Sequence, residues 1–158
     1  LTINERKPFI GGNWKSNGLT IDLEFFIHSC LNNISFDPKK MEVIVAPTAL
    51  HIAMVNDHLA NNIQVGAQNV SKFGNGAYTS QISAEILKDM DCNWTIIGHS
   101  ERRHLMHETD IDVGMKAKSA LDAGLKVIVC VGETMIQHDQ GKTDEVNARM
   151  LESIAAEL

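Results

Sequence analysis

The sequence contains no hydrophobic run long enough to cross a membrane and no cluster of basic residues. Its longer apolar stretches are short, such as residues 127–131, whereas a membrane-spanning helix needs about 20 residues. The formal net charge of -6 over 158 residues argues against a nucleic-acid groove. With 44% hydrophobic residues, the chain can still form a substantial core. We therefore expect a globular protein with neither a membrane nor a nucleic-acid partner.

The sequence has only three cysteines, and their spacing suggests no disulfide pairing. Cys130 falls inside an apolar strand pattern and Cys30 inside an amphipathic helix pattern, while Cys92 has no partner at a paired spacing. Reduced, buried thiols are typical of a reducing compartment, which favours a cytoplasmic location. An organelle reached after removal of a targeting leader is the alternative, because the sequence begins at Leu1 and not at Met.

Recognised metal and nucleotide signatures are also missing. His99, His104 and His107 with Glu108 could be imagined as metal ligands, but their spacing matches no known site. The glycine-rich segment 73–78 contains neither a GxGxxG nor a Walker pattern. We expect no metal.

The chain does contain short apolar runs that alternate with helical patterns. The runs are residues 8–10, 43–46, 63–67, 95–97 and 127–131. Each interval has room for a helix, so five βα units with parallel strands are predicted. Because the runs are continuously apolar, we expect a sheet that is covered on both faces.

Helix signals lie in the intervals between these runs. Thr20 and Thr48 are candidate N-caps, and Asp110 precedes a helical segment that Gly124 can end. Thr143 opens a last helix that has no stop signal. From this pattern we expect one domain, 1–158, that is truncated in the helix after the fifth strand.

Polar side chains follow the predicted strands at their carboxyl ends. Asn13 and Lys15 follow the first run, Gln68 the third, His99 the fourth and Glu133 the fifth. Ligands of parallel α/β sheets and barrels bind at this end, so these groups are expected to converge.

The segment IIGHSERR at residues 96–103 is the most informative of these strand ends. It predicts a buried strand that ends at Gly98 and a helix that begins at Ser100. An imidazole at such a junction faces the free amides of a helix start, which disfavour its protonated form. His99 is therefore expected to remain neutral and to donate a hydrogen bond to a substrate oxygen that gains charge.

Four motifs together resemble the triosephosphate isomerase family. They are GGNWKSNG at 11–18, GAQN at 66–69 with GAYT at 76–79, GHSERR at 98–103, and VCVGE at 129–133. Their order and intervals match across nearly the whole chain. The resemblance implies a (β/α)₈ TIM barrel of which this chain carries about the first five βα units. It also implies interconversion of dihydroxyacetone phosphate and D-glyceraldehyde 3-phosphate through an enediolate, without a cofactor.

The resemblance also implies roles for individual residues. Asn13 and Lys15 match substrate-binding positions, and the Lys15 ammonium would balance the charge of the phosphate and the enediolate. His99 matches the electrophile that polarises the carbonyl. Glu101 matches a catalytic-site position that forms a hydrogen bond near Lys15, and Cys130 a small supporting position behind the site.

A homodimer formed through the loop 69–80 is implied in the same way. Thr79 matches a residue that reaches into the neighbouring subunit, and Gln68 and Tyr78 are further candidate dimer contacts. Ser80-Gln81 replaces a common Gly-Glu after Thr79, and Ser16 replaces a common Met or Cys. These changes put the strength of the dimer contact in question.

The family's general base is a glutamate in a motif resembling Tyr-Glu-Pro-Val-Trp, which these 158 residues do not contain. Proton abstraction beside a carbonyl needs a positioned base, so we expect these 158 residues alone to be inactive. The alternative is a non-catalytic barrel module that associates with a partner or with itself. Without the motifs, a flavodoxin-like open sheet would be a further possibility.

Overall fold

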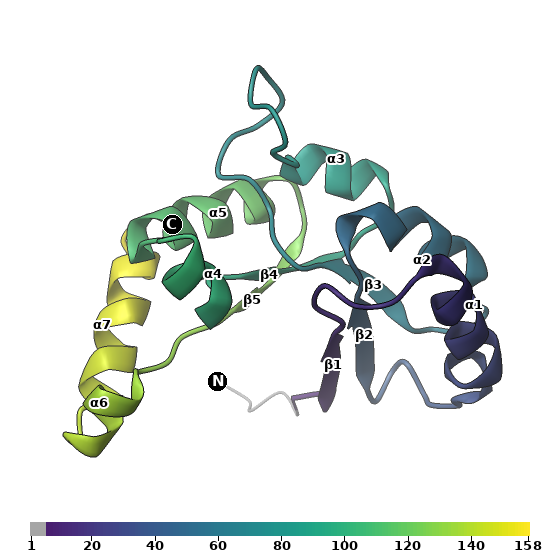
Figure 1. Cartoon of the computed structure of the whole chain (residues 1–158), viewed down its shortest axis with the longest axis horizontal. Coiled ribbons are helices and arrows are strands. Elements are labelled where there is room, and N and C mark those ends of the chain that lie inside the picture. Colours follow the sequence, from purple (N-terminus) through teal and green to yellow (C-terminus); the bar gives the residue numbers. More distant parts are fainter. Residues whose placement is uncertain (1–5) are drawn as a thin grey trace.

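A computed structural model describes residues 6–158 and shows an open, curved half-barrel of parallel strands with helices between them (Figure 1). The sheet order is β1-β2-β3-β4-β5, and each strand pairs in parallel with its neighbour in the chain. The strands are β1 (Phe9–Asn13), β2 (Glu42–Ala46), β3 (Gln64–Ala67), β4 (Trp94–Ile97) and β5 (Lys126–Val129).

Helices and short 3₁₀ turns occupy every interval between the strands, and two further helices follow β5. They are α1 (Thr20–Ser29), η1 (Leu31–Asn33), η2 (Ala49–His51), α2 (Ile52–His58), α3 (Ala84–Asp89), α4 (Ser100–Leu105), α5 (Asp110–Asp122), α6 (Met135–Asp139) and α7 (Thr143–Ala155). None of the helices in the described part of the chain is both long enough and apolar enough to cross a membrane.

The prediction of a partial TIM barrel is confirmed by this topology. Consecutive parallel pairing is the arrangement of a (β/α)₈ barrel, which needs eight strands to close. A flavodoxin-like sheet has the order 2-1-3-4-5 and is excluded. With five strands the sheet stays open, so β1 and β5 are edge strands in residues 6–158.

The expectation of a sheet covered on both faces is wrong. The longer helices lie along the outer, convex side of the sheet (Figure 1), because each crossover between parallel neighbours has the same hand. The concave side is open. Phe9 of edge strand β1, which lines a hollow on that side with Ile44, is 42% exposed.

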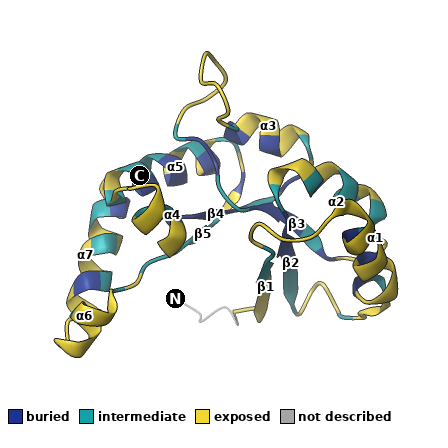
Figure 2. Ribbon diagram, viewed as in Figure 1, coloured by how far each residue is buried: buried dark blue, intermediate teal, exposed yellow. Residues whose placement is uncertain are grey.

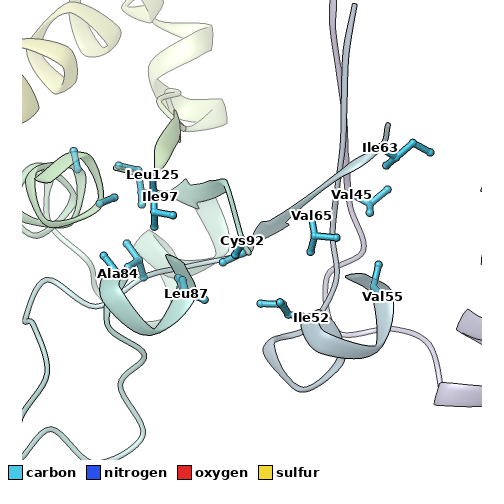
Figure 3. Packing of buried hydrophobic residues seen from close by; sticks show 14 of the residues in the cluster. Val45, Ile52, Val55, Ile63, Val65, Ala84, Leu87, Cys92, Ile97 and Leu125 are labelled. Carbon is cyan, nitrogen blue, oxygen red and sulfur yellow. The ribbon is translucent and has the colours of Figure 1, made fainter. Parts of the chain in front are cut away.

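The hydrophobic core lies between the convex face of the sheet and the helices. Val45 and Val65 point toward Ile52 and Val55 of α2, and Ile97 lies among residues of α3 and α5 (Figure 3). Figure 2 shows the matching pattern on the helices, whose buried residues face the sheet while their outer sides are exposed. Each fully buried aliphatic side chain contributes about 1.5–3 kcal/mol, so this layer fixes the positions of the strand ends.

Helix boundaries lie near the predicted positions, but several caps differ. Leu19, not Thr20, is the N-cap of α1, and no side-chain hydrogen bond caps that helix. Thr48 does precede a helical turn, yet its hydroxyl contacts the ring of His51 instead of a backbone amide. Asp110, predicted to precede a helix, is the first residue of α5; Thr109 caps that helix and forms a reciprocal capping box with Asp112.

Two predictions about cysteine are also wrong. Cys30 is exposed at the C-cap of α1 and is not buried within the helix. Strand β5 ends at Val129, so Cys130 follows the strand and is half-buried. Only Cys92 is fully buried, and burial raises the pKa of its thiol to about 11.

Helices α5 and α7 pack closely because a glycine lies at their contact. A Cβ atom at Gly114 would come within 2.6 Å of Glu157 Cγ and 3.0 Å of the Ile154 carbonyl oxygen. Val146 and Ile154 of α7 are buried. The last helix is therefore held against the body of the half-barrel.

Candidate functional site

Residues from three strand ends meet at one rim of the half-barrel. Asn13 is the last residue of β1, Gln68 follows β3 and His99 follows β4. Lys15 lies in the loop after β1, and Glu101 lies in the first turn of α4. Parallel strands all end at the same side of a sheet, so residues far apart in sequence are brought together here.

The first loop holds Lys15 in an unusual backbone conformation. Its φ is 54°, in the left-handed region that non-glycine residues seldom adopt. The Asn13 side-chain oxygen accepts a hydrogen bond from the Lys15 amide at 2.9 Å, and the Gln68 amide donates to the Lys15 carbonyl oxygen at 2.8 Å. Gln68 also donates to the Ala46 carbonyl oxygen at 2.9 Å. The surrounding contacts therefore fix this strained residue, a feature common at functional sites.

Lys15 and Glu101 form an ion pair across the rim. Their Nζ and Oε1 atoms are 2.7 Å apart, and both side chains are about half exposed. The hydrogen bond from Lys15 is the main reason that the pKa of Glu101 lies below its ordinary value. Because solvent screens this pair, its main effect is to orient the ammonium and only secondarily to stabilise the fold.

His99 is itself the N-cap of α4. Its Nδ1 accepts a hydrogen bond from the Glu101 backbone amide at 3.2 Å. The carboxylate Oε2 of Glu101 also lies 3.5 Å from Nδ1, a separation that would suit a protonated ring. The amide is the nearer partner and can only donate, so this contact favours the tautomer that carries its proton on Nε2.

His99 lines three hollows, of which the smallest, about 270 Å³, lies on the concave side and two larger ones lie at the rim. The first, of about 580 Å³, is lined by Lys15, Gln68 and Glu101 among others. The second, of about 510 Å³, is lined by Ser100, Cys130 and Glu133 among others. His99 lines both, so its ring can serve a ligand that bridges them. Burial raises the pKa of the Cys130 thiol, so this side chain stays protonated.

The segment between β3 and α3 projects from the body of the fold (Figure 1). Phe73 and Tyr78 stack within it, with ring centroids 4.4 Å apart and planes at 10°. Tyr78 and Thr79 are exposed. The structure thus keeps these two predicted dimer residues accessible but places Gln68 inside the rim. Their role as contacts between subunits stays a prediction.

Residues of α5 anchor the base of this loop. Lys72 forms an ion pair with Asp112 at 2.6 Å, and Lys116 donates to the Asn69 side chain at 2.9 Å. Lys72 is the main reason that the pKa of Asp112 lies well below its ordinary value, and the Thr109 amide and hydroxyl lower it further. The projecting segment is therefore tied to a helix that belongs to the core.

A buried charge network was missed in the sequence. Glu108 accepts hydrogen bonds from Arg102 and Lys116, and the side chains of Glu108 and Lys116 are 8% and 6% exposed. Burial is the main reason that the pKa of Lys116 falls below its ordinary value, and Glu108 opposes that shift. The sequence did contain a sign of this network, because Lys116 falls beside Val113 and Ala117 on the buried face of α5. A lysine there needs a buried partner.

The imagined metal ligands do not come together. Within residues 6–158, no group of three or more His, Cys, Asp or Glu side chains is arranged to hold a metal ion. Glu108 instead belongs to the buried charge network, while His107 is exposed on a left-handed turn.

Comparison with known proteins agrees with this geometry. The sequence model of the family "Triosephosphate isomerase" matches residues 8–158. The chain is 39% identical over 150 residues to the triosephosphate isomerase of Taenia solium, covering 95% of this chain and 59% of that protein. It is 40% identical to that of Paracoccidioides lutzii and 42% identical to that of Emericella nidulans, each over 153 residues. Each of these two matches covers 97% of this chain and 61% of the relative, so the chain spans about three fifths of these relatives.

The loop anchor leads to a prediction about acid stability. Replacing Asp112→Asn should lower the free energy of unfolding at pH 7 by about 1–2 kcal/mol, since a helix cap and an ion pair are weakened. The folded-state pKa is depressed, so this stabilisation is present above the ordinary value of 3.8 and is lost as pH falls below it. Urea unfolding should therefore show a smaller difference in the free energy of unfolding between wild type and variant at about pH 3 than at pH 7.

The exposed pair of Lys118 and Asp122 supplies the control. Asp122→Asn should change stability by less than about 0.5 kcal/mol at either pH. An equally large loss of stability for Asp112→Asn at both pH values would contradict stabilisation by the ionised Asp112 carboxylate.

Proposed function

The chain belongs to the triosephosphate isomerase family, and from this we propose that it carries the electrophilic half of a triosephosphate isomerase site. The substrate is then a phosphorylated triose, dihydroxyacetone phosphate or D-glyceraldehyde 3-phosphate, and no cofactor takes part. The observation that carries the proposal is the convergence of His99 and Lys15 at one rim, with His99 Nδ1 already occupied by the Glu101 amide.

The chemistry of the rim suits a carbonyl oxygen that gains negative charge. A neutral imidazole donates from Nε2 to that oxygen, and the Lys15 ammonium adds electrostatic stabilisation. Asn13 Oδ1 is occupied by the Lys15 amide, which leaves the Asn13 amide group as a further donor. Glu101 orients both partners, through its carboxylate toward Lys15 and through its backbone amide toward His99. These donors are in place before a ligand arrives, so little reorganisation is needed.

The proton-abstracting base is proposed to come from outside these 158 residues. They contain no counterpart of the family's Tyr-Glu-Pro-Val-Trp motif. The second hollow, between Cys130 and Ser100 beside His99, is open at the β5 side of the sheet and has room for a carboxylate from elsewhere.

The alternative is a module that associates with a partner or with itself and catalyses nothing. The exposure of Ile10, Phe9 and Phe25 along the β1 edge and on α1 is the observation in its favour. The two proposals differ in whether a charged ligand binds at the rim.

A homodimer formed through the loop 69–80 is a further part of the proposal. The stacked rings of Phe73 and Tyr78 support a projecting tip that bears Thr79. A braced, exposed tip loses little conformational entropy when it enters a neighbouring subunit.

We also propose a cytoplasmic location. The free thiols of Cys30, Cys92 and Cys130 support it, because reduced cysteines persist in a reducing compartment. Fractionation of the source cells would test it, and recovery in a sealed organelle would contradict it.

A polypeptide of these 158 residues should show no isomerase turnover in an assay coupled to a dehydrogenase, because no positioned base is present. His99→Gln is the control for contaminating host enzyme, whose activity would be the same in both preparations. Turnover that is present in the wild-type chain and lost in His99→Gln would overturn the statement about the base.

Lys15→Met should weaken binding of phosphoglycolate, whose carboxylate and phosphate mimic the charges of the enediolate. The loss should be about tenfold or more, since a charge-assisted hydrogen bond contributes about 1.5–3 kcal/mol. Chemical-shift titration of the 158-residue chain measures it, and Lys118→Met on the exposed face of α5 should bind as wild type does. Equal affinities of Lys15→Met and wild type would contradict the rim as an anion site and favour the non-catalytic module.

Thr79→Arg should shift the chain toward monomers, because an added charge at the loop tip must be desolvated on association. Sedimentation equilibrium should show at least about a tenfold weaker dimer, with Asp139→Arg on exposed α6 as the matched control. A wild-type chain that stays monomeric at every concentration would overturn the dimer proposal.

A further inference from the structure

Arg103 is the last residue of the segment 96–103, and the proposed function gives it no role. It lies on α4, away from the ion pair of Lys15 and Glu101, and its side chain is only 10% exposed. Burying a guanidinium costs free energy unless all its hydrogen-bonding groups find partners. The partners of Arg103 therefore indicate what it is for.

Three acceptors surround the guanidinium. Its Nε donates to the Gly98 carbonyl oxygen at 2.7 Å, and its Nη2 donates to the Cys130 carbonyl oxygen at 3.2 Å. Its Nη1 donates to the carboxylate of Asp110, the first residue of α5. One side chain thus joins the residue after β4, the residue after β5 and the start of α5.

The first two acceptors continue the β4–β5 pairing beyond the sheet. The last pair in register is Ile97 with Val129, and the Cys130 amide still donates to the Ile97 carbonyl oxygen at 2.9 Å. Past this point lie the carbonyl groups of Gly98 and Cys130. Arg103 donates to both, and the planar fork of a guanidinium can do so at fixed angles where a lysine cannot.

Gly98 shows that this contact is tight. Its φ is +67°, and a Cβ atom there would lie 2.9 Å from Arg103 Nη2 and 2.9 Å from Val113 Cγ1. The left-handed turn and the absence of a side chain let the guanidinium reach the carbonyl oxygen. His99 follows directly, so the orientation of this peptide decides where its ring points.

We propose that Arg103 is a positioning residue that directs the Nε2 atom of His99 by holding the Gly98 peptide and the end of β5 in register. The inference rests on the proposed function for its catalytic meaning, since His99 is the electrophile of that proposal. The other restraint on the ring is the 3.2 Å contact from the Glu101 amide to Nδ1, which is long for a hydrogen bond that acts alone. Arg103 supplies the backbone restraint.

The test observes His99 directly in the 158-residue chain. Nitrogen-15 spectra of the histidine side chains, with His99→Gln to assign the signals, should show one fixed Nε2–H tautomer in the wild type. Arg103→Lys keeps the charge but loses the fork, so the His99 signals should move to the averaged positions of a mixed tautomer. Arg149→Lys, on the exposed face of α7, is the matched control and should leave them unchanged.

Far-UV circular dichroism separates this effect from unfolding. A folded Arg103→Lys variant with unchanged His99 signals overturns the proposal. Should that variant unfold, Asp110→Asn, which releases only one of the three contacts, is expected to shift the same signals. Unchanged signals there overturn the proposal as well.

A measurement on the wild-type chain tests the contact between Arg103 and Gly98 without any variant. Hydrogen exchange at Arg103 Nε–H should be strongly slowed by its bond to Gly98, and exchange at the rate of a free guanidinium overturns the proposal. Failure of the proposed function looks different, because phosphoglycolate would then not bind while the His99 tautomer and the Arg103 protection remained as expected.

Discussion

Parallel pairing of strands in chain order is the constraint from which the rest of this structure follows. It places all five strand ends on one rim and sends the longer helices of residues 6–158 to the convex side of the sheet. The rim then collects side chains that are separated by more than 80 residues, as the contact between Lys15 and Glu101 illustrates. The core under α2, α3 and α5 holds the strand ends still, so packing on the convex side determines geometry at the rim.

The roles of the ion pairs in this molecule depend on how deeply each pair is buried. The pair of Lys15 and Glu101 is exposed and screened, so it remains available to a charged ligand. The pair of Glu108 and Lys116 is nearly excluded from solvent. Removal of Glu108 would leave the charge of Lys116 uncompensated, whereas Glu108 is also paired with Arg102. Arg103 lies between these extremes and uses its charge to organise backbone carbonyls.

The order of the strands could be predicted from local patterns and motifs, and so could the convergence of Asn13, Lys15, Gln68 and His99 at one rim. What failed depends on contacts that a linear pattern does not contain. Continuous apolar runs indicate burial but cannot show that one face of the sheet stays open. Thr20 was a plausible cap and Asp110 a plausible residue before a helix, yet both are the first residues of their helices and the N-caps are Leu19 and Thr109. The partner of Lys116 comes from the loop before its own helix, and only folding brings the two together.

The sheet order also has a consequence for how the molecule folds. In residues 6–158 every strand pairs only with strands next to it in the sequence, so no pairing has to wait for a distant segment. Each parallel pairing nevertheless closes a crossover of about 20 to 33 residues, as Ile44 with Gln64 and Phe9 with Glu42 show, and parallel sheets are slow to form for this reason. Each βα unit adds to a preformed edge, much as successive units assemble in a solenoid. The half-barrel therefore has the character of a linear array, in which any adjacent pair of units can nucleate and opening begins at β1 or β5.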